Sequence, residues 1–155
     1  MLFRSMTASS PTRRLCLLLI DDNPADCMLA QEAFEQYSEQ VSIKVIQDGQ
    51  SALDWLHEQA TKQSLPDVVL LDVNMPGMNG FEVLSALRNE TTFRHLPVVM
   101  LTTSTRQEDV DLAYELIASS YLVKQPDFRG FLDQIDSLVR FWSQARFRQQ
   151  PKPVN

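Results

Sequence analysis

Cysteine and histidine are scarce in this sequence, with two of each among 155 residues. His57 falls in a predicted helix and His95 in a predicted loop, so neither has a partner Ser, Cys or metal-ligand set in view. Both histidines are expected to serve ordinary surface or loop structure. Cys16 and Cys27 lie in an apolar run and a helical stretch, and we expect buried thiols in a reducing compartment, without a disulfide.

Long hydrophobic runs are also missing. The run LCLLLI, residues 15–20, follows Arg13 and Arg14 as the apolar core of a signal peptide would, but it stops at Asp21. A signal core or a membrane span needs a longer run than this one. The sequence therefore predicts a cytoplasmic protein with no membrane partner.

The body of the chain has no excess of positive charge. The net charge is −6, and seven basic residues without any acid lie at the two ends, in residues 1–14 and 140–155, which leaves −13 for residues 15–139. An acidic body argues against nucleic acid as a direct partner. The length and the 44% hydrophobic content suit one domain with its own core, and we expect no room for a second.

Strand-like and helical segments alternate along the whole chain, without repeats or low-complexity stretches. Strands separated by helices imply right-handed crossovers and a parallel sheet covered on both faces. The turn residues Asp48-Gly49 and Asn79-Gly80 fall at the expected joints. The sequence predicts an α/β fold, a doubly wound five-stranded parallel sheet with five helices. The strands are predicted at 15–21, 41–47, 67–72, 97–102 and 121–123, and the helices at 25–37, 51–62, 80–89, 108–119 and 127–146.

Residues 68–71 (VVLL) form a strand that shows no polar alternation and ends on an aspartate. Such a strand is buried on both faces, as in parallel sheets covered by helices. Asp72 therefore lies at the carboxyl edge of the sheet, which is where ligands bind in open α/β folds. The ends of the other strands bring Asp21, Asp22, Thr102 and Lys124 to the same edge.

This set of side chains suits the transfer of a phosphoryl group onto a carboxylate. Carboxylates within ~5 Å of one another repel by roughly 3 kcal/mol per pair, so the cluster calls for a divalent cation or a raised pKa. Oxygen ligands without His or Cys favour Mg²⁺. Asp72 is the best nucleophile, with Asp21 and Asp22 on the metal. Lys124 and Thr102 can bind phosphoryl oxygens.

Each of these residues also has an ordinary structural explanation. Asp21 and Asp22 can cap the first helix, Asp72 can cap the following loop, Thr102 can be a strand-end hydroxyl, and Lys124 can be a surface charge. Taken singly, these explanations are the stronger ones. Their joint occurrence at four strand ends favours a functional site.

Four ordered motifs, LLLIDDNPAD, LLDVNMPGMNG, PVVMLTTS and SYLVK, together resemble the receiver domain of two-component response regulators over residues 14–142. The resemblance implies the flavodoxin-like receiver fold that chemotaxis regulators share. The ending DFRGFLDQIDSLVRFW is closer to the small stand-alone regulators that pair with phytochrome-type kinases. The implied function is a single-domain response regulator of a phosphorelay, a switch and not an enzyme, that is phosphorylated by a sensor histidine kinase and signals through changed protein contacts.

The resemblance also assigns roles to individual residues. It implies that Asp72 is the phosphoacceptor, that Thr102 and Lys124 contact the phosphoryl group, and that Tyr121 is the aromatic switch residue. The Mg²⁺ ligands that it implies are Asp21, Asp22, Asp72 and the main-chain carbonyl of Asn74, with Asp22 the direct ligand of the first pair.

Two positions depart from the family pattern. Asn79 stands where the family has an acidic loop residue, which is a mild change for a turn. Lys124 is followed by Gln125 where the family has proline after a cis bond, and Pro126 comes one place later. A non-proline cis bond costs ~3 kcal/mol, so we expect a trans bond here and a lysine that reaches the phosphoryl site less well.

Two other functions compete with this one. A phosphatase of the haloacid dehalogenase type also uses an aspartyl nucleophile and Mg²⁺, but it needs a second acid two residues on, where this chain has Asn74. A degenerate receiver would only bind partners. The full set of Asp72, Thr102 and Lys124 argues against it, whereas Gln125 keeps it open.

The last predicted helix carries more apolar residues than a core stripe needs. We expect a flexible N-terminal tail at 1–13, the receiver domain at 14–146 and a C-terminal tail at 147–155. The surplus aromatics favour a homodimer through the fourth helix, the fifth strand and the last helix. The stripe is predicted to consist of Phe128, Phe131, Leu132, Ile135, Leu138, Val139 and Trp142, and the surplus of Phe141, Trp142 and Phe147.

Overall fold

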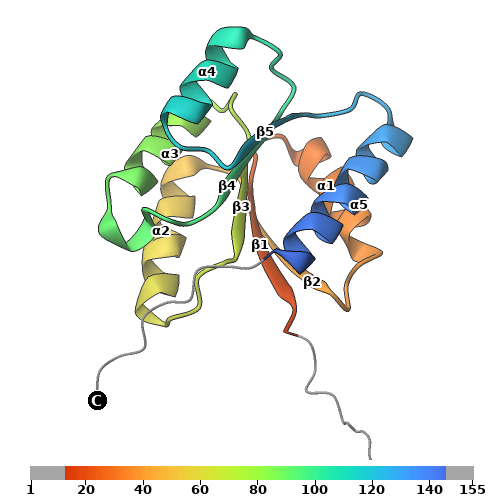
Figure 1. The fold of residues 1–155 in the computed structure, drawn as a ribbon, viewed down its shortest axis with the longest axis horizontal. Coiled ribbons are helices and arrows are strands. Elements are labelled where there is room, and N and C mark those ends of the chain that lie inside the picture. Colours follow the sequence, from red (N-terminus) through yellow and green to blue (C-terminus); the bar gives the residue numbers. More distant parts are fainter. Residues whose placement is uncertain (1–12, 146–155) are drawn as a thin grey trace, which may run out of the picture.

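A parallel five-stranded sheet lies between two layers of helices (Figure 1) in the computed structural model, which describes residues 13–145. The strand order is β2-β1-β3-β4-β5. The predicted α/β, doubly wound architecture is thereby confirmed. The strands are β1 (Leu15–Ile20), β2 (Val41–Ile46), β3 (Val68–Leu71), β4 (Val98–Thr102) and β5 (Ser120–Val123); the helices are α1 (Pro24–Glu35), α2 (Gly49–Thr61), α3 (Gly80–Arg88), α4 (Gln107–Glu115) and α5 (Phe128–Gln144), with a 3₁₀ turn η1 (Thr91–Phe93).

The central strands are apolar on both faces because helices cover both. Helices α1 and α5 lie on one face of the sheet, and α2, α3 and α4 on the other (Figure 1). Along β1, Leu18 and Ile20 pack into one hydrophobic cluster and Leu17 and Leu19 into the other. Burying each such side chain contributes about 1.5–3 kcal/mol. The firmly packed strands β1, β3 and β4 therefore fix the positions of the residues at their carboxyl ends.

The helices α1, α3 and α5 begin on polar caps. The side-chain oxygen of Asn23 accepts hydrogen bonds from the first turn of α1, and Asp127 caps α5 in the same way. Asn79 forms a reciprocal capping box with Glu82 at the start of α3, with both bonds at 3.0 Å. An amide oxygen serves this cap as well as a carboxylate would, which explains how Asn fits this turn.

Helix α4 ends earlier than predicted. The pattern predicted helix to Ser119, but α4 stops at Glu115 and Ile117 adopts a left-handed φ of 63°. The chain must turn there because β5 begins at Ser120, which pairs with Val99 of β4. The guanidinium of Arg88 donates to the Ile117 carbonyl at 2.9 Å and stabilises the turn.

Some predicted core residues lie elsewhere. Phe128 is 46% exposed, since it is the first residue of α5 and lies beyond the reach of the core, so its place in the stripe was wrong. Trp142 packs against the core and belongs to the stripe, not to the exposed surplus.

Cys16 is half-buried and Cys27 buried, both as free thiols. Phe147 and the tails, apart from Arg13, lie outside the described residues. Within residues 13–145, no helix is long and apolar enough to cross a membrane.

Candidate functional site

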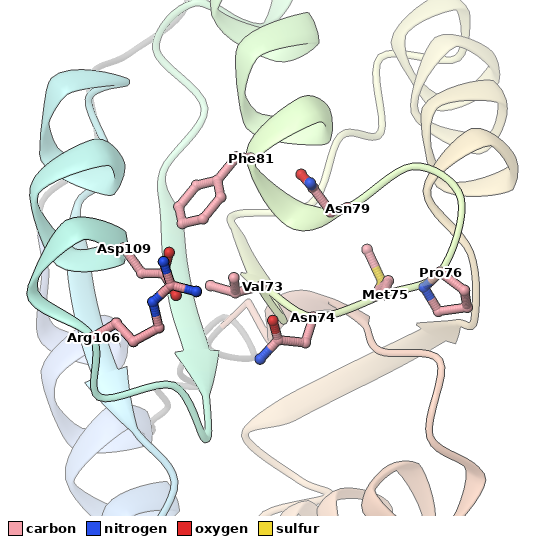
Figure 2. Close-up of a pocket in the computed structure, with 8 residues that line it drawn as sticks. All are labelled: Val73, Asn74, Met75, Pro76, Asn79, Phe81, Arg106 and Asp109. Atoms are coloured by element: carbon pink, nitrogen blue, oxygen red, sulfur yellow. The ribbon is translucent and has the colours of Figure 1, made fainter.

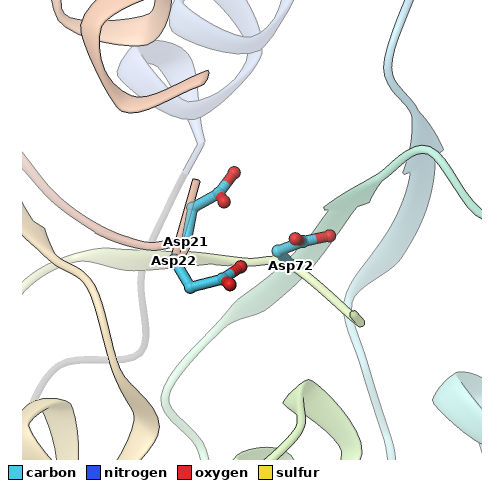
Figure 3. Close-up of side chains that lie close together, drawn as sticks. All are labelled: Asp21, Asp22 and Asp72. Carbon is cyan, nitrogen blue, oxygen red and sulfur yellow. The ribbon is translucent and has the colours of Figure 1, made fainter. Parts of the chain in front are cut away.

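Three carboxylates meet at the carboxyl edge of the sheet, where β1 and β3 end (Figure 3). One oxygen each from Asp21, Asp22 and Asp72 lies within 4.8 Å of the others. Asp21 and Asp72 are buried, and Asp22 is half-buried. They meet because β1 and β3 are neighbours in register, Ile20 pairing with Leu71, so that the residues after both strands lie side by side. Packed oxygen donors of this kind suit a hard divalent cation.

Asp72 lies in a desolvated environment. Its side chain is buried, and this burial raises the pKa of Asp72 above its ordinary value. The positive charge of Lys124 opposes the shift, the negative charge of Asp21 adds to it, and hydrogen bonds from the Thr102 hydroxyl and the Asn74 N–H again favour the ionised form. A carboxylate that is desolvated and crowded by a like charge gains stability from a cation or from a covalent bond that spreads its charge.

Lys124 enters the site from the loop after β5. Its side chain is only 10% exposed, and Nζ donates to Asp21 Oδ2 at 2.7 Å and to Asp26 Oδ2 at 3.0 Å. Burial by itself lowers the pKa of Lys124, but the hydrogen bond and charge of Asp21, with Asp72 and Asp26, outweigh it and raise the pKa. The lysine therefore stays charged beside the carboxylates.

The bond after Lys124 is trans, as predicted, since residues 13–145 contain no cis peptide bond. The amine lies 2.7 Å from Asp21, and its reach to a phosphoryl group on Asp72 stays a prediction. Asp26 is a site residue that the sequence reasoning missed. Its position in the first turn of α1, one turn after the DD pair, is the signal that points it back toward this edge.

Thr102 and Tyr121 are linked through the loop after β4. Thr102 is fully buried, and its hydroxyl oxygen accepts the Ser104 N–H at 3.2 Å. The Tyr121 hydroxyl donates to the Ser104 carbonyl at 3.0 Å, and the Ser104 hydroxyl bonds to Asp109. Thr102 thus lies at the site, at the end of β4, and Tyr121 contacts the loop that follows Thr102.

A hollow beside the cluster separates the loop after β3 from the start of α4 (Figure 2). Val73 and Asn74, the two residues after Asp72, lie on one wall, and Arg106 and Asp109 on the other. Arg106 forms an ion pair with Glu108 at 3.0 Å. The hollow thus has the loop after Asp72 on one wall and the guanidinium of Arg106 on the other.

The same edge of the sheet thus holds Asp21, Asp22, Asp72, Thr102 and Lys124, as predicted, with Asn74 directly behind Asp72. The model for the response regulator receiver domain matches residues 17–136. The chain belongs to this family. Receiver domains typically accept a phosphoryl group on an aspartate, and they bind a divalent metal through acidic residues.

Two known proteins are similar to this chain over most of its length. It is 38% identical over 127 residues to the probable methanogenesis regulatory protein FilR2 of Methanothrix harundinacea, covering 81% of this chain and 82% of that protein. Identity to the response regulator Rcp1 of Synechocystis is 31% over 128 residues, covering 81% and 87%. The chain is therefore homologous to single-domain response regulators.

Solved structures agree with this assignment. The phosphorylated cyanobacterial phytochrome response regulator RcpA matches with a TM-score of 0.79 at 29% identity, over 85% of this chain and 96% of that one. The Mn²⁺-bound form of Rcp1 matches with a TM-score of 0.76 at 29% identity, over 87% and 99%. The receiver-domain family works with histidine kinases as a switch, and the structure of this chain has the same five-stranded frame.

Proposed function

We propose that Asp72 is the phosphoacceptor of this receiver domain and that a sensor histidine kinase is its donor. The observation that carries the proposal is the buried Asp72 carboxylate, which has an oxygen within 4.8 Å of two further carboxylates, one of them paired with Lys124. In the transfer, an Asp72 oxygen forms a bond to phosphorus while the bond from phosphorus to the histidine nitrogen breaks. That nitrogen keeps the electron pair and takes up a proton.

The surrounding residues stabilise the charge that arrives. Mg²⁺ would be held by Asp21, Asp22, Asp72 and the Asn74 carbonyl, and it would neutralise phosphoryl oxygens. Lys124 would turn from the carboxylates to one phosphoryl oxygen, and the Thr102 hydroxyl would donate to another. Movement of the loop that follows Thr102 would then be passed to Tyr121 through Ser104.

A phosphatase of the haloacid dehalogenase type is the weaker alternative, because Asn74 lies where its general acid would be. The experiment that tests the proposal is intact mass measurement after incubation with acetyl phosphate, with Mg²⁺ and with chelator. A gain of one phosphoryl mass per chain that requires Mg²⁺ supports the proposal. A chain that stays unmodified in both conditions refutes it and leaves a receiver that only binds.

We expect Asp22 to contribute more than Asp21 to Mg²⁺ affinity. Both oxygens of Asp21 already accept hydrogen bonds, from the Asn23 N–H at 3.0 Å and from Lys124 at 2.7 Å, whereas Asp22 is half-buried and open to an ion. Calorimetric titration should give a loss of about tenfold or more for Asp22→Asn and a smaller one for Asp21→Asn. The reverse order would overturn the assignment of Asp22 as the direct ligand.

The proposed partners are proteins. Homology to Rcp1 and RcpA supports a phytochrome-type histidine kinase as the donor. The acidic body of the chain supports a protein output over nucleic acid, in the cytoplasm where such kinases deliver phosphate. Residues 14–146 are proposed as the receiver unit, with tails at 1–13 and 147–155.

We expect phosphorylation to favour a homodimer through α4, β5 and α5. Large apolar side chains face solvent there: Tyr114 of α4 is 51% exposed, Phe141 of α5 is 63% exposed, and Ile117, in the turn between α4 and β5, is 67% exposed. Burying each one across a symmetric interface contributes ~1.5–3 kcal/mol. Sedimentation with acetyl phosphate and Mg²⁺ should show a dimer that Tyr114→Ser or Phe141→Ser weakens at least tenfold.

The matched control is Met28→Ser, which changes an equally exposed side chain on α1, outside this face. It should leave the dimer unchanged. Monomers in every condition, or equal weakening by the control, would remove the dimer and leave partner contacts as the output.

A further inference from the structure

The loop that carries Lys124 lacks the proline that fixes it in the family pattern. Its backbone is trans, and Gln125 follows the lysine. On one side the loop is held by the sheet, since the Lys124 N–H donates to the Thr102 carbonyl at 2.8 Å. On the other side, another contact has to hold the loop in place of the proline ring. The position of the Lys124 amine depends on where this backbone lies.

The side chain of Gln134 on α5 provides that constraint. Its amide Nε2 donates to the Val123 carbonyl at 2.6 Å, and its Oε1 accepts the Gln125 N–H at 3.0 Å. The two bonds span Lys124, one on the residue before it and one on the residue after it. A proline at position 125 has no N–H, so the second bond requires a residue other than proline at this position.

The start of α5 is shaped to receive this loop. A Cβ added at Gly130 would lie 3.0 Å from the Cβ of Gln125 and 2.9 Å from a carboxylate oxygen of Asp127, closer than real Cβ atoms normally come. Glycine therefore lets the stem of Gln125 pack against the helix. Asp127 accepts the Gly130 N–H at 2.9 Å and fixes the same turn. The loop is thus locked onto α5 by packing and by hydrogen bonds.

We propose that Gln134 is a positioning residue for Lys124, doing through two hydrogen bonds what a cis proline does elsewhere in the family. This inference rests on the proposed function at one point, which is that Lys124 acts at Asp72. With the loop held, the lysine reaches Asp21 at 2.7 Å and Asp26 at 3.0 Å. Without the clamp, the backbone around Lys124 gains freedom and the amine leaves the carboxylates for part of the time.

Mg²⁺ affinity reports the position of this amine without any phosphoryl transfer. A positive charge bonded to Asp21 weakens Mg²⁺ binding, so Lys124→Ala should tighten it by about tenfold. Gln134→Leu should tighten it by at least threefold, and the double variant should bind no more tightly than Lys124→Ala alone. A role in stability alone would give additive changes or none.

Three further measurements secure the result. Gln144→Leu, a matched change of an exposed glutamine at the end of α5, should leave Mg²⁺ affinity unchanged. The Gln125 amide should exchange its proton faster in Gln134→Leu than in the unsubstituted chain. If Gln134→Leu fails to fold, Gln134→Glu replaces it. Glutamate keeps the acceptor for the Gln125 N–H but places an oxygen, which cannot donate, against the Val123 carbonyl. This variant should tighten Mg²⁺ binding to a smaller degree.

Each outcome is decisive. Unchanged affinity in both Gln134 variants, or in Lys124→Ala, overturns the inference, because Gln134 would then have no amine to hold beside the metal ligands. Additive changes in the double variant overturn it too. Failure of the proposed function looks different: the chain takes no phosphoryl group from acetyl phosphate while the Mg²⁺ titrations keep the pattern expected for the clamp.

Discussion

Asp72→Asn is expected to abolish the phosphoryl gain completely while leaving the protein folded. The amide has the shape of the carboxylate but offers no nucleophilic oxygen, so the loss should be at least about 1,000-fold in rate. The substitution should also stabilise the apo protein. Burial, with the negative charge of Asp21, disfavours ionised Asp72, and a neutral amide removes that unfavourable interaction, so the free energy of unfolding should rise.

The sign of the pH dependence follows from the raised pKa of Asp72. The folded chain holds this proton more tightly than the unfolded chain, so stability falls as pH rises from the unfolded pKa through the folded one. The advantage of Asp72→Asn should therefore be present above that window and disappear below it. Urea unfolding in chelator measures it, and intact mass after acetyl phosphate treatment measures the phosphoryl gain.

The control for Asp72→Asn is Asp133→Asn, which removes an exposed carboxylate from α5. It should keep full phosphorylation and unchanged stability. If Asp72→Asn still gains a phosphoryl group while Asp21→Asn does not, the phosphoacceptor is not Asp72 and the proposed roles must be exchanged.

Gly80→Ala is expected to damage both the fold and the site. A Cβ at Gly80 would collide with the backbone carbonyl oxygen of Asp72 and come within 3.0 Å of the Val73 Cα. Neither atom can move aside cheaply, because Gly80 also donates its N–H to the Val73 carbonyl at 3.0 Å. We expect a loss of about 2–4 kcal/mol in the free energy of unfolding and a phosphorylation rate at least tenfold lower.

Gly77→Ala separates this collision from simple backbone strain. Gly77 has a φ of 73° but nothing within 4 Å of the position of an added Cβ, so alanine should cost only about 1 kcal/mol. Urea unfolding and the rate of mass gain from acetyl phosphate compare the two variants. An equal cost at both glycines would show that the close approach of α3 to Asp72 does not matter.

The sequence predicts most of this fold because its strand ends and turns are chemically distinct. The apolar run VVLL ends at once on Asp72, and Asn79-Gly80 opens α3, so the parallel order and the cluster at the sheet edge follow. The contacts that the sequence did not reveal are those made across elements. Asp26 meets Lys124 only because α1 and the loop after β5 converge at one edge. The turn at Ile117 carries no glycine or asparagine that would signal its left-handed backbone.

The role of Gln134 was also not predicted from the sequence, because its contacts lie between two elements. It lies on α5 as one polar residue among several, and nothing in its spacing links it to Lys124. Its function appears only when the loop after β5 folds back along the first turns of α5. Interactions of this kind depend on how elements pack, which hydrophobic periodicity does not encode.

The ion pair between Asp21 and Lys124 joins residues 103 positions apart in the chain. During synthesis, the three carboxylates leave the ribosome long before the lysine that pairs with Asp21. Contacts of such long range form late, because the loop they close must first be ordered. Until β5 adds to the edge of the sheet beside β4, the chain carries its acids without their cation. A chain that stops before β5 therefore holds its three carboxylates without the lysine that pairs with Asp21.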